Sequence, residues 1–143
     1  MTKFIIDKIV VKIGHLRQYL AYLNKIKAMA LSQKEYNANF LIFGNTERYI
    51  QLSVQCLMDI CHLILVERGL KIPADTGDVF SILRKDRIIS EKTASNLIKM
   101  VGMRNILVHE YGEIDNEKVY DVLKNKLKDF EIFEKEILKY LNK

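Results

Sequence analysis

The chain has few of the residues that form linkers and loops. Its 143 residues include one proline and six glycines, and 49% of them are hydrophobic. This composition leaves little room for flexible linkers or disorder, and the length suits one domain with a single core. We therefore expect residues 1–143 to form one domain.

Membrane and export signals are also lacking. No apolar run reaches the length that spans a bilayer. The first seven residues, from Met1 to Asp7, lack the apolar core and small-residue cleavage site of a signal peptide. The sequence predicts a soluble, cytoplasmic protein with no membrane partner.

Cysteine is scarce, and its spacing does not fit a redox or zinc pair. Cys56 and Cys61 stand five apart in one expected helix, which separates their side chains by about 140° at ~100° per residue. We interpret them as buried thiols in a reducing compartment. Asp59 and His62 lie near Cys61, but they make an incomplete ligand set with no second cluster. The sequence predicts no metal and no cofactor.

The positive charge is concentrated near the start of the chain. Residues 1–34 carry seven Lys or Arg and one acid, whereas residues 113–143 carry seven basic and eight acidic residues. The first helix could therefore present a basic surface to a polyanion such as RNA. The alternative is that these lysines only solvate an exposed face.

The hydrophobic pattern is helical, with no sustained strand alternation. Apolar residues recur at steps of three and four, which is typical of amphipathic helices. The expected helices cover residues 4–30, 46–68, 78–85, 90–104 and 115–141. We predict an all-α bundle of about five helices, mostly up-and-down.

Several residues mark the ends of these helices. A polar break covers residues 32–39, and Gly69 ends the second helix. Asp78, Ser90 and Asp115 are expected N-caps of the three later helices. The second helix is apolar almost all round, so we expect it to be central, covered by other helices or by a second subunit.

One short stretch gathers the reactive groups. Arg104, His109 and Tyr111 lie close together around the apolar Ile106 to Val108. If the helix from Ser90 runs on through Arg104, the guanidinium lies on its last turn. Gly112 and a new cap at Asp115 favour a helix end here, and we expect His109 and Tyr111 to share a face in or beside a turn.

These residue types suit cleavage of a phosphodiester. RNA cleavage without a metal needs a base for the 2′-hydroxyl, an acid for the leaving 5′-oxygen and a cation for the phosphorane charge. His109 has an ordinary pKa near ~6.5 and could serve as base or acid. Arg104 would supply the cation, with Asn105 as a polar helper. The alternative is a buried Arg–His–Tyr hydrogen-bond network that closes a helix end.

The string RNILVHEYG at residues 104–112 has the spacing Arg-x4-His-x-Tyr. With Glu47-Arg48-x-Ile50-Gln51 and Met58-Asp59-Ile60-Cys61, it resembles the HepT-like ribonuclease toxins of the HEPN superfamily, over essentially the whole chain. The resemblance implies a HEPN-like bundle that dimerises with its motifs facing one cleft. It also implies a cognate partner, a minimal nucleotidyltransferase antitoxin that places AMP groups on Tyr111.

The sequence thus predicts a metal-independent endoribonuclease toxin of a type II/VII-like toxin–antitoxin system. Arg104 and His109 would be catalytic, Asn105 supporting, and Tyr111 the site of adenylylation. The substrate would be RNA, cleaved by a homodimer. An alternative is a non-catalytic, nucleotide-binding helper subunit of a nucleotidyltransferase, and a third possibility is a plain dimeric scaffold. His15 and His62 are expected to be helix residues with local partners.

Overall fold

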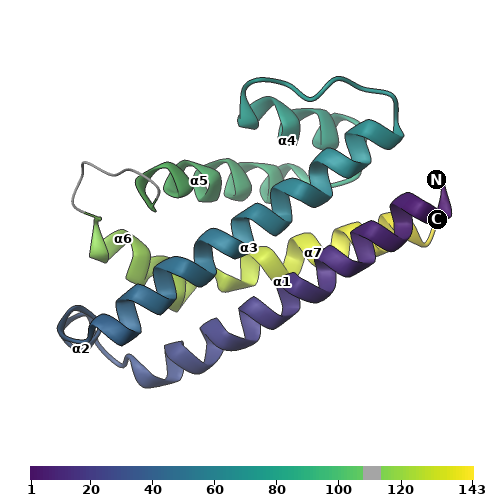
Figure 1. The fold of residues 1–143 in the computed structure, drawn as a ribbon. Helices are drawn as coiled ribbons and strands as arrows, with labels where there is room; N and C mark the ends of the chain where they lie inside the picture. Colours follow the sequence, from purple (N-terminus) through teal and green to yellow (C-terminus); the bar gives the residue numbers. More distant parts are fainter. Residues whose placement is uncertain (108–113) are drawn as a thin grey trace.

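The chain forms a bundle of helices. The computed structural model describes the backbone of residues 1–107 and 114–143, and the side chains of residues 1–103 and 114–143. Within these residues there is no strand, so the all-α prediction is confirmed. The elements are α1 (Lys3–Met29), α2 (Gln33–Ala38), α3 (Phe40–Glu67), α4 (Thr76–Lys85), α5 (Glu91–Leu107), α6 (Asn116–Asp121), the π-helical turn η1 (Val122–Lys126) and α7 (Leu127–Leu141) (Figure 1).

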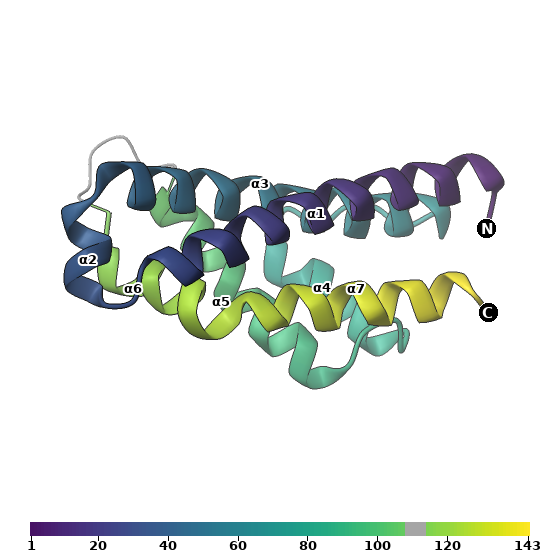
Figure 2. The same ribbon diagram turned by 90° about the horizontal axis from the view of Figure 1, so that it is seen from below.

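The long helices run up and down the bundle. α1 packs along α3, and α5 and α7 complete the bundle, with α4 beside α5 (Figures 1 and 2). The two termini lie at one end, and α2 and α6 lie at the other (Figure 2). This arrangement matches the predicted up-and-down topology.

α1 has the amphipathic stripe that the sequence indicates. Thr2 caps it, because its hydroxyl accepts a hydrogen bond from the Ile5 amide at 3.3 Å. The predicted core positions are all buried: Ile9, Ile13, Leu16, Leu20, Leu23 and Ala30. Burial of this stripe against α3 removes apolar surface from water, which is the main force that stabilises the pair.

α3 is the central helix, as predicted. It contacts α1, α2, α4, α5 and α6, and its buried residues include Ile50, Val54, Leu57, Ile60 and Ile64. By length and composition alone α3 could cross a membrane, which the sequence analysis did not anticipate. The criterion is weak, because a core helix also meets it, and 56% of the most apolar window of α3 is buried inside the bundle.

The start of α3 corrects one prediction. The helix begins at Phe40 rather than near Thr46, and Asn39 caps it by accepting a hydrogen bond from the Leu41 amide at 3.0 Å. Gly44 lies inside the helix and does not break it. A single glycine costs only ~1 kcal/mol in a helix, which the packing of a 28-residue helix easily offsets.

The predicted polar break at residues 32–39 is also wrong in part, because it contains α2. Ser32 caps this helix through a 3.1 Å hydrogen bond from the Glu35 amide. Tyr36 is fully buried and packs against the ring of Tyr120, with centroids 5.2 Å apart. The burial of one aromatic side chain therefore orders a segment whose composition is polar.

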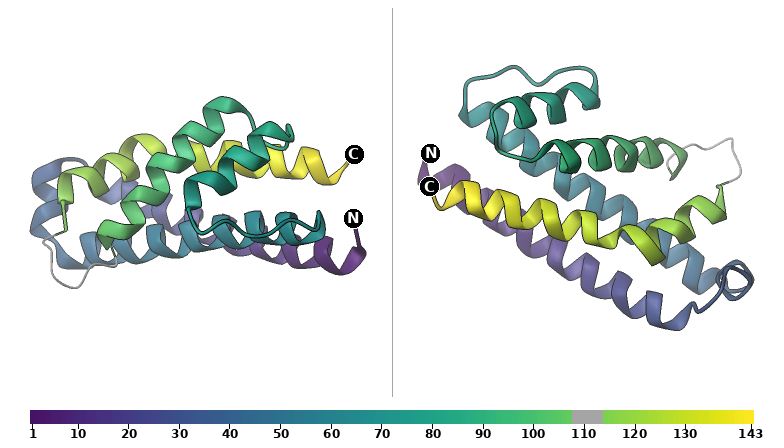
Figure 3. Two further views of the ribbon diagram at one scale, coloured as in Figure 1. Left: turned by 90° about the horizontal axis from the view of Figure 1, so that it is seen from above. Right: turned by 180° about the vertical axis from the view of Figure 1, so that it is seen from behind.

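Two further helix boundaries differ from expectation. Asp75, not Asp78, caps α4, since its carboxylate accepts a hydrogen bond from the Gly77 amide at 2.8 Å. The C-terminal helix does open at Asp115, as predicted. It is interrupted at η1, however, where the chain bends between α6 and α7 (Figure 3). Gly69 does end α3, with the positive φ of 71° that favours glycine.

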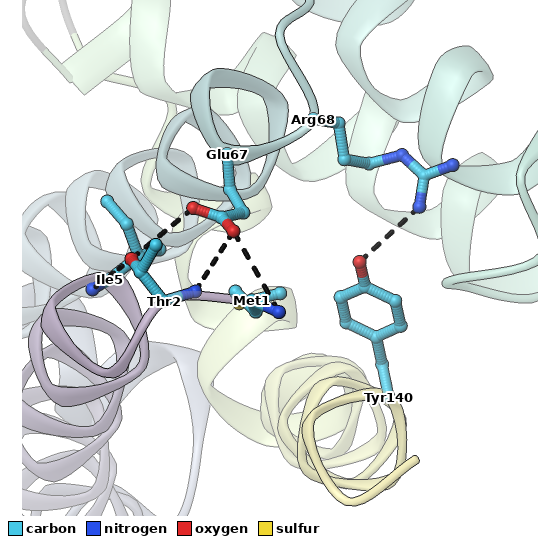
Figure 4. Close-up of polar contacts among 6 residues, drawn as sticks. All are labelled: Met1, Thr2, Ile5, Glu67, Arg68 and Tyr140. Atoms are coloured by element: carbon cyan, nitrogen blue, oxygen red, sulfur yellow. Dashed lines mark hydrogen bonds and ion pairs between the residues drawn. The ribbon is translucent and has the colours of Figure 1, made fainter.

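Polar contacts hold the two termini against the end of α3. The Thr2 amide donates to the Glu67 carboxylate at 3.0 Å, and the Met1 amino group lies 3.9 Å from the same carboxylate (Figure 4). The neighbouring Arg68 guanidinium donates to the Tyr140 hydroxyl at 3.4 Å (Figure 4). Both cysteines are free and buried, which confirms the prediction for them.

Candidate active site at the end of helix α5

α5 carries the first part of the motif, and its N-terminus is firmly capped. The Ser90 hydroxyl accepts a hydrogen bond from the Thr93 amide at 3.1 Å, as its predicted role as N-cap requires. Glu136 of α7 accepts hydrogen bonds from the Ser90 amide at 2.7 Å and from the Thr93 hydroxyl. A carboxylate at this position also interacts favourably with the helix dipole. The cap therefore fixes α5 against α7.

The other end of α5 presents Arg104 and Asn105. The helix runs to Leu107, so both residues lie on its last turn. The helix therefore runs on through Arg104, which the sequence left open. His109, Tyr111 and Gly112 lie outside the described residues, and the shared face of His109 and Tyr111 stays a prediction.

The chain re-enters the bundle through a second cap. Ile114 is partly buried against the core, and Asp115 accepts hydrogen bonds from the amides of Glu117 at 3.1 Å and Lys118 at 3.3 Å. The motif is thus bounded by the last turn of α5 and the capped first turn of α6. Both boundaries belong to regular helices, which suits a site that must hold catalytic groups in place.

This end of the bundle is tied to the α1–α2 turn. The Gln33 side chain donates to the Asn116 carbonyl at 3.3 Å, and the Tyr120 hydroxyl donates to the Ala30 carbonyl at 3.0 Å. Lys124 donates to the Lys27 carbonyl at 3.2 Å. Tyr120 and Lys124 thus satisfy backbone carbonyls near the end of α1, and Gln33 satisfies one at the start of α6. Together these contacts hold α6 in position beside the motif.

Two titratable groups near the start of α3 are perturbed by burial. Burial raises the pKa of the Tyr36 hydroxyl well above its ordinary value, and the nearby Glu47 carboxylate adds to the effect. Burial also raises the pKa of Glu47 itself. Glu47 and Arg48, which contribute to the family resemblance, lie in the half of α3 that packs near α2.

A large cavity lies elsewhere, between α1 and α3. It has a volume of about 590 Å³ and is lined mainly by apolar side chains, including Phe4, Val11 and Val66. Lys12 and Gln55 both donate to the Asp59 carboxylate at its edge, at 2.9 and 2.8 Å. Asp59 is thus engaged by two neighbouring side chains, and the lining of the cavity contains no described residue of the motif.

The structure also gives other surroundings to the residues that could suggest a metal. Asp59 is engaged by Lys12 and Gln55, and Cys61 is fully buried, which raises the pKa of its thiol. No group of three or more potential metal-binding side chains gathers among the residues that the structure describes.

The basic residues of α1 do not form one free surface. Lys12 pairs with Asp59, Arg17 pairs with Glu134, and the Lys8 ammonium lies 4.6 Å from the centre of the Phe4 ring. Local partners therefore use part of the positive charge for which the sequence left open either an RNA surface or a solvated face.

Sequence reasoning missed a set of polar residues where α5 packs on α7. The Asn96 side chain donates to Asp129 Oδ1 at 3.4 Å, and both residues line small cavities between the helices. No sequence pattern predicts a contact between two residues that are 33 positions apart. Only the packing of α5 against α7 reveals the set.

The sequence is similar to known ribonucleases. Residues 19–137 match a family model described as Ribonuclease HepT-like. The chain is 29% identical over 127 residues to the mRNA nuclease HepT of Shewanella oneidensis, across 89% of this chain and 93% of the relative. It is 30% identical over 124 residues to the tRNA nuclease HepT of Aphanizomenon flos-aquae, across 87% of this chain and 83% of the relative.

The fold is similar to a solved toxin. A structure of the tri-AMPylated Shewanella oneidensis HEPN toxin in complex with MNT antitoxin superposes with a TM-score of 0.82 at 27% sequence identity. The match covers 97% of this chain and 99% of that one. Sequence and fold thus agree on the same group of proteins.

Proposed function

This chain belongs to the HepT-like ribonuclease family, and we propose that it is a metal-independent endoribonuclease toxin whose active site contains Arg104 and His109. One observation carries the proposal. In a chain of this family, α5 places Arg104 on its last turn, five residues before the histidine of the motif. Relatives described as mRNA and tRNA nucleases support RNA as the substrate.

The chemistry follows from the residue types. An imidazole can take the proton from a 2′-hydroxyl, and the resulting oxygen attacks the adjacent phosphorus. The bond to the 5′-oxygen breaks, and a protonated imidazole can supply that oxygen with its proton. Arg104 offers a permanent positive charge and paired N–H donors to the phosphorane oxygens. Asn105, on the same helical turn, would help to position the phosphate.

A homodimer would complete this site. One chain supplies a single motif histidine, whereas the reaction uses both a base and an acid. Two chains with their motifs in one cleft would supply both. Large exposed apolar side chains support the proposal of a dimer, because Phe40 is 70% exposed and Phe4 is 66% exposed.

We further propose that a minimal nucleotidyltransferase antitoxin silences the toxin by adenylylating Tyr111. The phenol oxygen would attack the α-phosphate of ATP, pyrophosphate would leave, and a base in the partner would take the phenol proton. The solved toxin with three AMP groups in complex with its MNT antitoxin supports this. An adenylate two residues from His109 would pair with Arg104 and repel the RNA backbone.

The proposal places the protein in the cytoplasm, where RNA and ATP are available. Purified protein incubated with labelled RNA and a chelator tests it, and cleavage at internal positions is the expected result. Binding of a nucleotide without any cleavage would favour the helper-subunit alternative instead.

A further inference from the structure

The face between α5 and α7 is furrowed along its length. Three cavities of about 430, 60 and 150 Å³ lie there in a row. The first two share Ser90 in their walls, and the last two share Asn96 and Asp129. We call this continuous depression the α5–α7 furrow, and the two helices that form it lie side by side in Figure 3.

The furrow leads to the motif. Its α5 wall is made by Lys92, Asn96, Lys99 and Met103, which follow one another at steps of four, three and four. Such steps keep a stripe on one side of a helix. The stripe extends about 16 Å along the axis. Met103, its last member, directly precedes Arg104 in the sequence.

Cations line the furrow from end to end. Among the residues that the structure describes, most of these cations have no ion-pair partner, and Lys126 alone lies near a carboxylate, 3.5 Å from Asp121. They come from α4 and its end, from α5, from η1 and from α7: Arg84, Arg87, Lys92, Lys99, Lys126 and Lys139.

Acidic side chains in the furrow are mostly engaged by the protein. Glu136 accepts hydrogen bonds from Ser90 and Thr93, and Asp129, which is only 9% exposed, accepts one from Asn96. Glu91 is the remaining carboxylate in the described walls. The furrow therefore offers a net positive path.

We propose that the α5–α7 furrow binds the sugar–phosphate backbone of single-stranded RNA and guides it to the motif. The proposal rests on the proposed function, because it takes RNA as the substrate. A positively charged groove that follows the backbone is how proteins hold single strands without reading their sequence. The lysines would position the strand, and the motif would act where the furrow ends.

RNA fits the furrow better than a protein partner does. Cations outnumber carboxylates in the walls, whereas the centres of protein interfaces are depleted in charged residues. The cavity between α1 and α3 has a mainly apolar surface, and its two lysines are matched by two aspartates. A polyanion is the ligand that matches a row of cations.

A binding experiment tests the furrow without cleavage. The probe is a fluorescent 2′-O-methyl RNA oligonucleotide, which keeps the phosphates but lacks the nucleophilic hydroxyl. Its affinity is measured by anisotropy at several salt concentrations for the wild type and for the double variant Lys92→Gln/Lys99→Gln. The matched control is Lys3→Gln/Lys25→Gln, which removes two exposed lysines from α1.

We expect the furrow variant to bind about tenfold more weakly and the α1 control to bind within about twofold of the wild type. Loss of two phosphate contacts should also lower the slope of log affinity against log salt by about 1.4. Both lysine pairs lie on exposed positions, so circular dichroism should show both variants folded.

Equal weakening in both variants, or no binding by the wild type, would overturn the furrow proposal. The proposal would also be overturned if the furrow variant kept its RNA affinity but no longer bound the partner nucleotidyltransferase. That result would assign the furrow to that protein. Cleavage of the matching ribose RNA is measured separately. Binding without cleavage removes the nuclease proposal alone, and cleavage without a furrow effect removes the furrow proposal alone.

Discussion

Three histidines occur in the chain, and their places differ in a way that bears on catalysis. His15 is exposed on α1, and His62 lines the apolar cavity between α1 and α3. Neither lies on the helix that carries Arg104. His109 alone follows that helix in sequence, so a histidine-dependent reaction at this site depends on it. Its neighbour Arg104 then sets where a phosphate would be held.

At the same scale, Tyr111 is predicted to be the residue that receives adenylate. Incubation of the protein with its partner nucleotidyltransferase and ATP should increase its mass in multiples of one adenylate group. Tyr111→Phe should abolish the increase, because the phenylalanine lacks the attacking oxygen. Intact-mass spectrometry measures this directly.

Tyr22→Phe is the control for Tyr111, since it removes a hydroxyl from a partly exposed tyrosine on α1. It should be modified like the wild type. If Tyr111→Phe protein gains as much mass as the wild type, adenylylation occurs elsewhere and the proposed role of Tyr111 is wrong.

At the scale of elements, α5 links the stability of the bundle to the site. Its N-terminal cap by Ser90 and Glu136 joins it to α7, and its last turn carries Arg104 and Asn105. A change at one end of this helix should therefore affect stability without touching the reacting groups at the other.

Ser90→Ala tests the cap of α5. Loss of the 3.1 Å hydrogen bond from the Thr93 amide should lower the free energy of unfolding by about 1 kcal/mol. Chemical denaturation measures the change. Ser95→Ala is the control, because Ser95 is exposed in the middle of the same helix and should change stability little. A Ser90→Ala protein as stable as the control would show that Glu136 alone holds this helix end.

Long helices could be predicted from the sequence because their apolar residues repeat over many turns. α1 follows that rule. The caps at Ser90 and Asp115 could be predicted from residue type, because serine and aspartate are favoured as N-caps. The short α2 could not be predicted, since six residues are too few for a period to show. The burial of Tyr36 by distant residues stabilises it, and sequence pattern does not report such contacts.

The interruption at η1 was missed for a related reason. Val119, Leu123 and Leu127 continue a helical spacing across it, so periodicity alone predicts one helix. The residues of the motif are predicted from their types and spacing, and their roles stay a prediction. The α5–α7 furrow was not, because its walls come from segments about 30 positions apart that only the fold brings together.

At the scale of the whole molecule, two faces stand out among the residues that the structure describes. The first is the apolar surface around Phe4, Val11 and Val66, and the second is the cationic α5–α7 furrow. Their different chemistry suits different ligands, because apolar surface is stabilised by burial against protein, whereas cations are attracted to a polyanion.

The chain is predicted to be a homodimer in solution. Sedimentation velocity at micromolar concentration should give twice the mass of one chain, because exposed side chains such as Phe40 and Val66 would be removed from water by association. A dilution series separates a stable dimer from weak association. A monomer throughout the series would remove the two-chain active site from the account.

The rate of RNA cleavage by His109→Ala protein in the presence of chelator tests the central claim most directly. Loss of a general acid–base group should slow cleavage by roughly 10²–10⁴-fold, and Arg104→Ala should also lose cleavage. His15→Ala, which changes an exposed histidine on α1, should cleave like the wild type. Cleavage by His109→Ala at the wild-type rate would contradict the account.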